Sequence, residues 1–157
     1  MTNPPKRLIL TLALALIATP ILAVDTGGGS GGSGGGSSDS APTVASMDSV
    51  RQLIDAENYQ SAWSALSQIT AVDTENADAW NLLGFSSRKL GKMKSAAFAY
   101  SMALRIDPKH LGALEYQGEM FMILGELDKA KANLEKLQTL CGDCEEAQDL
   151  AAAVAKG

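Results

Sequence analysis

Two cysteines near the C-terminus are the residues whose spacing most clearly suggests chemistry. Cys141 and Cys144 are separated by two residues, a spacing found in redox motifs, in half of a metal site and in short structural disulfides. A thioredoxin-like redox site needs a βαβ context, but no strand-like alternation occurs outside the N-terminal apolar segment. A metal site needs further ligands, and the chain has one histidine, His110. We therefore favour a structural disulfide, with thiol and metal chemistry as the alternatives.

No other set of residues suggests catalysis. With one histidine, the chain offers no visible nucleophile, base and acid set. The run of glycine and serine over 27–38 lacks the lysine and the preceding strand of a phosphate-binding loop. Met93, Met102, Met120 and Met122 have a spacing that is typical of core filling rather than of a soft-metal site. We therefore expect no enzymatic activity, no cofactor and no bound metal.

The stretch over 77–110 predicts two helices joined by a turn. Small and apolar residues recur at helical spacing on one face of each helix, and a proline follows the second helix. These positions are Trp80, Leu83, Gly84, Ala96, Tyr100, Ala103 and Pro108. Gly91 interrupts the pattern where the two helices would turn back on each other. Proline cannot continue a helix, so we expect the second helix to end near Asp107.

This spacing resembles the tetratricopeptide repeat, whose period is about 34 residues. A shift by one period in either direction aligns Ala96 with Ala62 and Ala130, and Gly84 with Gly118. Antiparallel helices approach closely only where side chains are small, so these residues are expected at the contact between the helices of each hairpin. The resemblance implies an all-α fold, an antiparallel helix-hairpin solenoid.

The expected domain covers 43–157 and contains three repeats, about the minimum for a stable solenoid. The predicted repeats and the C-terminal capping helix occupy 43–76, 77–110, 111–144 and 145–156. Asp143 is predicted to be the N-cap of the last helix. Glu146, Gln148 and Asp149 are predicted to face solvent, which would make this helix a solubilising cap.

The first 23 residues have the pattern of a secretory signal peptide. Lys6 and Arg7 precede an apolar run over 8–17, and Ala23 is the predicted cleavage point. Without cleavage the segment would anchor the chain in a membrane, although its apolar stretch is at the short limit for a span. We therefore expect a periplasmic or secreted bacterial protein, or a membrane-anchored one if the segment is not cleaved.

Residues 24–42 predict a flexible linker, because they are rich in glycine and serine and contain little that could be buried. Export would also place Cys141 and Cys144 in an oxidising compartment, where paired cysteines tend to close.

The charge balance excludes some classes of partner. The chain has 13 Lys and Arg against 18 Asp and Glu, a net charge of −5. Removal of Lys6 and Arg7 with the signal peptide leaves 11 against 18, or −7. Nucleic-acid binding depends on neutralising phosphates, so an acidic domain argues against it. Contact with a membrane is expected only if the signal segment is retained.

The resemblance also implies a binding surface, because the first helices of such repeats line a concave groove that receives a peptide or a protein segment. The matching positions include Arg51, Asn81, Phe85, Arg88, Lys89, Tyr116, Glu119 and Met122. Arg88 and Lys89 would form a basic centre suited to a ligand with an acidic group and an apolar anchor. Alternatively, these two residues only offset the dipole of their helix.

The expected function is therefore non-enzymatic: a scaffold that binds a protein or peptide partner, as an adaptor or assembly factor of the bacterial envelope. One alternative is an assembly factor that self-associates into a homo-oligomer. The other is a thiol or metal role of Cys141 and Cys144.

Overall fold

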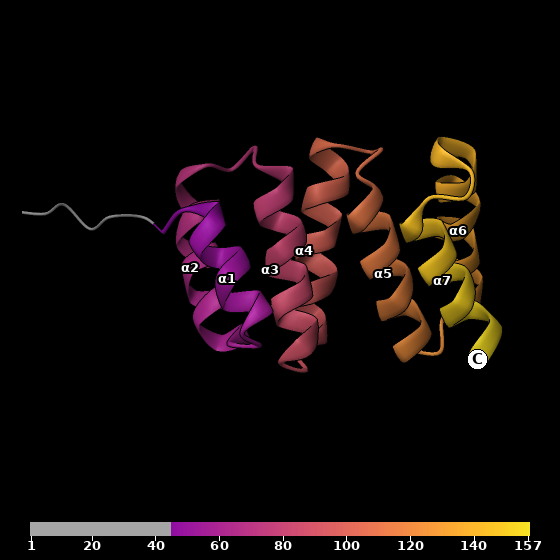
Figure 1. Ribbon diagram of the computed structural model, residues 1–157, viewed down its shortest axis with the longest axis horizontal. Helices are drawn as coiled ribbons and strands as arrows, with labels where there is room; N and C mark the ends of the chain where they lie inside the picture. The colour runs from indigo at the N-terminus through magenta and orange to yellow at the C-terminus, as the bar shows by residue number, and fades with distance from the viewer. Residues whose placement is uncertain (1–44) are drawn as a thin grey trace, which may run out of the picture. The chain divides into compact units, whose positions relative to one another are not determined.

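The computed structural model describes residues 45–157, and the predicted signal peptide and linker, over 1–23 and 24–42, lie outside the described residues. The described residues form seven α-helices and no strand, so the expected all-α class is confirmed. The helices follow one another as antiparallel pairs with a final single helix (Figure 1). Their bounds are α1 Met47–Asp55, α2 Tyr59–Val72, α3 Ala77–Lys89, α4 Met93–Ile106, α5 Leu111–Ile123, α6 Leu127–Cys141 and α7 Glu145–Lys156. From residue 45 onward, no helix is long and apolar enough to cross a membrane.

Polar side chains begin four of the helices by accepting a hydrogen bond from a backbone N–H of the first turn. These capping residues are Ser46, Asn58, Asn76 and His110. The Nδ1 atom of His110 accepts from the N–H of Ala113 at 3.2 Å, which leaves the ring proton on Nε2 to be donated to Asp78 Oδ1 at 3.0 Å. The single histidine therefore starts α5 and links it to α3.

Each hairpin turns through one residue with a positive φ. Gly91 and Gly125 have φ of 72° and 73°, as the break in the sequence pattern at Gly91 predicts. At the same position of the first repeat stands Glu57, with φ of 55°. A side chain in this region costs conformational energy that glycine avoids.

Small residues allow the helices to approach, as the repeat pattern predicts. Ala62, Ala96 and Ala130 are completely buried. A Cβ added to Gly84 would lie 2.5 Å from the ring of Tyr100, which belongs to the other helix of the same hairpin.

Gly118 behaves differently from Gly84. A Cβ added to it would lie 2.5 Å from Leu150 on α7, so this glycine opens space for the final helix. The repeat pattern did not predict this contact, because α7 supplies the large side chain at this point.

The turn between α6 and α7 contains the cysteine pair. The Sγ atoms of Cys141 and Cys144 lie at disulfide distance, 2.07 Å, and neither thiol is free. The N-cap of α7 is Cys144, without a capping side-chain hydrogen bond, so the prediction that Asp143 is the N-cap is wrong. The helix begins at Glu145, and Asp143 instead accepts, through its backbone carbonyl, a hydrogen bond from Gln148 Nε2 at 2.6 Å.

Candidate functional site

Three aromatic rings from α2, α3 and α5 meet and are called here the aromatic cluster: Tyr59, Phe85 and Tyr116. The ring of Phe85 stands at its centre, with centroids 6.0 Å from that of Tyr59 and 4.9 Å from that of Tyr116. All three side chains are half-buried, so part of each ring faces solvent. The helical period brings Phe85 to this position, one turn before the two cations that end α3.

Arg88 lies beside the aromatic cluster but is already paired. Its Nη2 atom is 2.6 Å from Glu119 Oε2 on α5, and its Nε donates to the hydroxyl of Tyr100 at 3.4 Å. The Arg88 side chain is only 10 % exposed. Burial raises the pKa of Tyr100 well above its usual range, and Arg88 opposes that rise only in part. The guanidinium therefore holds α3, α4 and α5 together, and its charge is neutralised within the chain.

Lys89 is the exposed cation of this region. Its Nζ lies 5.8 Å from the ring centroid of Tyr59 and 5.3 Å from that of Phe85. At these distances the ammonium interacts with the ring faces while remaining in water. The predicted basic centre thus consists of one neutralised guanidinium and one exposed ammonium.

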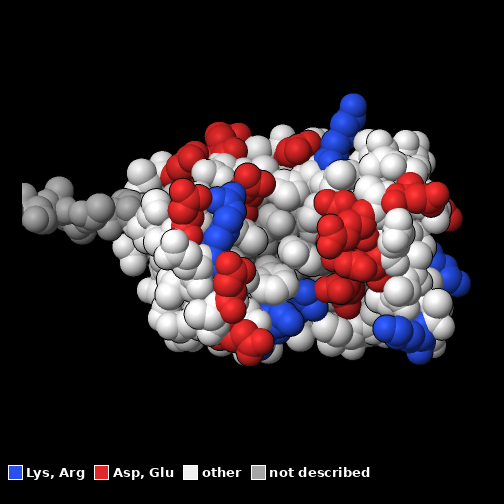
Figure 2. Space-filling model, viewed as in Figure 1, with Lys and Arg blue, Asp and Glu red and all other residues white. Residues whose placement is uncertain are grey.

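A pocket of about 260 Å³ lies next to the aromatic cluster, and we call it the acidic pocket. It is lined by residues of α3, α5 and α7: Asn81, Leu82, Gly112, Glu115, Tyr116, Glu145, Glu146 and Asp149. Figure 2 shows acidic side chains gathered over α5 and beside α7, with basic side chains below and to the left of them. Tyr116 belongs to both surfaces, so the acidic pocket and the aromatic cluster adjoin.

Glu115 is the most buried carboxylate of the acidic pocket, with 8 % of the residue exposed. Burial raises its pKa to about 7, and the negative charges of Glu119, Asp149 and Glu146 add to the rise, while Arg88 opposes it. Protonated and ionised forms of Glu115 therefore both occur near neutral pH. A buried carboxyl among like charges is typical of a functional position.

Asn81 on α3 also lines the acidic pocket. The residue is 5 % exposed, and its Oδ1 atom accepts no hydrogen bond from any residue of the described domain. A buried amide oxygen without a donor costs about 1–3 kcal/mol relative to a satisfied one. The pocket thus combines carboxylates with a lining residue whose buried amide oxygen has no donor among the described residues.

The structure brings together six of the eight predicted groove residues, namely Asn81, Phe85, Arg88, Lys89, Tyr116 and Glu119. The other two stand apart from this group of contacts. Arg51 pairs with Asp48 on its own helix at 3.1 Å, and Met122 lies near the C-terminal Gly157.

The carboxylates of α7 are the functional candidates that the sequence analysis missed. Glu146 is half-buried and lines the acidic pocket, so the expectation that it faces solvent is wrong. Gln148 and Asp149 are exposed as predicted, and Asp149 also lines the pocket. A signal was present, since Glu146 and Asp149 follow Gly112 and Glu115 by one repeat period of about 34 residues. The final helix therefore continues the row of first helices instead of only capping it.

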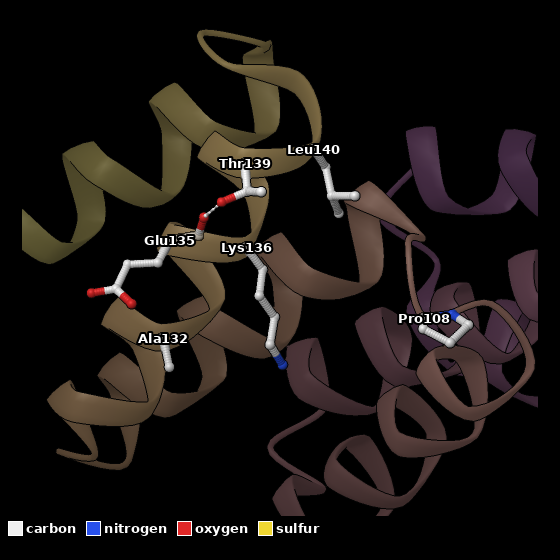
Figure 3. Close-up of a pocket in the computed structure, with 6 residues that line it drawn as sticks. All are labelled: Pro108, Ala132, Glu135, Lys136, Thr139 and Leu140. Carbon is white, nitrogen blue, oxygen red and sulfur yellow. Dashed lines mark hydrogen bonds between the residues drawn. The ribbon is translucent and has the colours of Figure 1, made fainter.

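Two other pockets lack the cluster of carboxylates that lines the acidic pocket. One of about 460 Å³ lies on the outer side of α6, with Pro108 at its edge (Figure 3). Within it, the Thr139 hydroxyl donates to the Glu135 carbonyl at 2.8 Å, and none of its lining residues belongs to the acidic pocket. Another of about 380 Å³ is walled by Trp63, Trp80 and Phe98. Among the described residues, no group of three or more His, Cys, Asp or Glu is arranged to hold a metal ion.

Comparisons with known proteins agree with this architecture. The family model described as tetratricopeptide repeat matches residues 77–110, and a search of curated proteins found no match. The second TPR domain of human RPAP3, in complex with the HSP70 peptide SGPTIEEVD, is similar with a TM-score of 0.63 and 21 % identity over 70 % of this chain and 92 % of that one.

Two further solved structures have the same fold. The TPR domain of Arabidopsis OM64 has a TM-score of 0.64 and 16 % identity over 69 % of this chain and 90 % of its own. The Yersinia enterocolitica type III secretion chaperone SycD, in complex with a peptide of the translocator YopD, has a TM-score of 0.61 and 20 % identity over 69 % of this chain and 83 % of that one. Residues 77–110 therefore match a tetratricopeptide repeat, and the described helices on either side of them share the fold of tetratricopeptide-repeat domains.

Proposed function

We propose that this protein is a non-catalytic adaptor or assembly factor that binds an extended segment of a partner protein across α3, α5 and α7. The observation that carries the proposal is the meeting of the half-exposed aromatic cluster with the acidic pocket on consecutive helices. Aromatic side chains beside a polar pocket supply apolar anchoring and orientation to a bound chain. Two of the similar structures are described as complexes with peptides, which supports a peptide ligand.

A role in the bacterial envelope is part of this proposal and rests on the predicted signal peptide over 1–23. A thiol-dependent role has less support, because Cys141 and Cys144 are paired with each other and are the only cysteines of the chain.

Site-specific photocrosslinking tests the proposal. A benzophenone amino acid replaces either Lys89, beside the aromatic cluster, or Glu135, on the outer side of α6. We expect a defined partner to crosslink from position 89 and not from position 135. Phe85→Ala should reduce the yield at position 89 about tenfold, because a central aromatic anchor is worth roughly 1–2 kcal/mol or more.

The control is circular dichroism, which should show unchanged helical content in every variant. Equal crosslinking from both positions, or none from either, would contradict the proposal. Crosslinks between two copies of the chain, together with a mass that rises with concentration in sedimentation, would favour self-association instead.

A further inference from the structure

We propose that the acidic pocket receives the cationic side chain of a lysine or arginine in the bound segment. This inference rests on the proposed function, and it specifies the chemistry of the ligand.

The charge of the pocket is the first argument. Four carboxylates line it, from Glu115, Glu145, Glu146 and Asp149, and none of them forms an ion pair within the described domain. Glu145 and Glu146 lie in the first turn of α7, where they also offset the helix dipole. A helix dipole does not explain the position of the Glu115 carboxylate, because Glu115 lies in the second turn of α5 and is almost completely buried.

The unsatisfied amide of Asn81 is the second and independent argument. Its Oδ1 atom needs a hydrogen-bond donor, and no residue of the described domain supplies one. An ammonium or guanidinium group carries only donors, so it could satisfy this oxygen and pair with the carboxylates at the same time. A carboxylate ligand would carry only acceptors and would add a fifth negative charge.

The surroundings favour a cation on an extended chain over a free ion. Tyr116 borders the pocket and contacts Phe85, so it offers an aromatic wall to the aliphatic part of a lysine or arginine. A neighbouring apolar residue of the segment would then reach the aromatic cluster. The opposite chemistry, an acidic group held by Arg88, is disfavoured because Glu119 already neutralises that guanidinium.

Proton linkage provides a supporting observable. Since the pKa of Glu115 is raised to about 7, a bound cation should lower it and release a fraction of a proton near neutral pH. The groups facing Glu115 are Glu119, Glu146, Asp149 and Arg88, and the first three add to the rise. Binding is therefore expected to tighten as the pH increases from 6 to 8.

The test starts with selection of random twelve-residue peptides by display, using the wild-type domain as bait. Selected peptides are synthesised with acetylated and amidated ends, so that only side chains carry charge. We expect a shared lysine or arginine, and replacement of that residue by norleucine should weaken binding to the wild type about tenfold.

A double-mutant cycle then locates the contact. Glu115→Gln should remove most of the discrimination between lysine and norleucine, whereas the matched variant Glu135→Gln on the outer side of α6 should keep it. If Glu115→Gln loses helical content, Asp149→Asn on the exposed rim takes its place. Calorimetry in two buffers of different ionisation enthalpy should show proton release with wild type and none with Glu115→Gln.

The possible failures separate the two proposals. Peptides that require Phe85 but no basic residue would overturn the inference and leave the proposed function standing. An equal norleucine effect in wild type and Glu115→Gln would also overturn it. Selection of no peptide at all would contradict the proposed function itself.

Discussion

The aromatic cluster and the acidic pocket adjoin, yet their ionisable side chains are held in opposite ways. Arg88 is buried against aromatic rings and has an internal partner in Glu119, at 2.6 Å. Glu115 is equally buried, but the charges nearest to it are mostly negative. Burial of a paired charge is a structural feature, whereas burial of a carboxyl among like charges opposes folding. The comparison therefore separates the aromatic cluster, where the buried charge has an internal partner, from the acidic pocket, where the carboxylates have none among the described residues.

The largest expected change in the free energy of unfolding comes from removing the negative charge of Glu115 in the acidic pocket. The pKa of Glu115 is raised from 4.5 to about 7, so the folded state binds more protons than the unfolded state between these values. The stabilisation of the folded state that comes from protonation of Glu115 is fully present below pH 4.5, and it is lost as the pH rises through 7. Glu115→Gln should therefore raise the free energy of unfolding at pH 8 by up to about 3 kcal/mol and have little effect at pH 4.

Urea denaturation at the two pH values measures this difference. Glu135→Gln, an exposed carboxylate on α6, serves as the control and should show no pH-dependent change. A Glu115→Gln variant that is less stable than wild type at pH 8 would remove the distinction between the two regions.

The same substitution at Glu119 is expected to have the opposite sign. Glu119→Gln leaves the Arg88 guanidinium, with 10 % of the side chain exposed, without its carboxylate. Loss of one partner of a mostly buried pair should lower the free energy of unfolding by about 2 kcal/mol, reduced from the fully buried case because Glu119 itself is 30 % exposed. Thermal unfolding at pH 7 measures it, and the double variant Arg88→Met/Glu119→Leu should recover most of the loss. A neutral result would show that the pair contributes no structural stability.

Removal of the cysteine pair should affect the acidic pocket more than the aromatic cluster. Cys141 ends α6 and Cys144 precedes α7, which carries three of the four carboxylates of the pocket. Cys141→Ser/Cys144→Ser should cost about 2 kcal/mol, as expected for a short closed loop. Hydrogen exchange should increase over α7 and remain unchanged over α3. Uniform loss of protection would indicate that the helices unfold together instead.

The smallest expected change in the free energy of unfolding comes from replacing Lys89, the exposed cation beside the aromatic cluster. Lys89→Met keeps an aliphatic chain beside Tyr59 and Phe85 but removes the ammonium. The cost in the free energy of unfolding should be less than about 1 kcal/mol, because water competes for the charge. Chemical denaturation at low and high salt measures it. A loss as large as that of Glu119→Gln would mean that Lys89, too, is a structural cation.

Much of the fold could be predicted because it depends on local patterns. The break at Gly91, the buried Ala62, Ala96 and Ala130, and the end of α4 before Asp107 all follow from residue types at helical or repeat spacing. One contact that the pattern did not predict joins residues far apart in the sequence, because Gly118 packs against Leu150 of α7. The error at Asp143 is local, because the neighbouring Cys144 is the N-cap of α7.

The candidate site was only partly predictable for the same reason. Six of the eight predicted groove residues meet, because the repeat period places them on successive first helices. The roles of their charges could not be predicted from the sequence. The ion pair between Arg88 and Glu119 joins two separate helices, so the sequence alone did not show that the Arg88 guanidinium is neutralised.

By itself, the sequence determined an acidic helical-repeat protein, its hairpins and the approximate line of its groove, because repeat spacing and small residues act through neighbours along the helix. Only the tertiary structure decided that Arg88 is neutralised, that Glu115 and the oxygen of Asn81 are buried without partners in the described domain, and that α7 lines the acidic pocket. Burial and distance between separate helices set these properties, since the energy of a charge depends on which groups surround it in space.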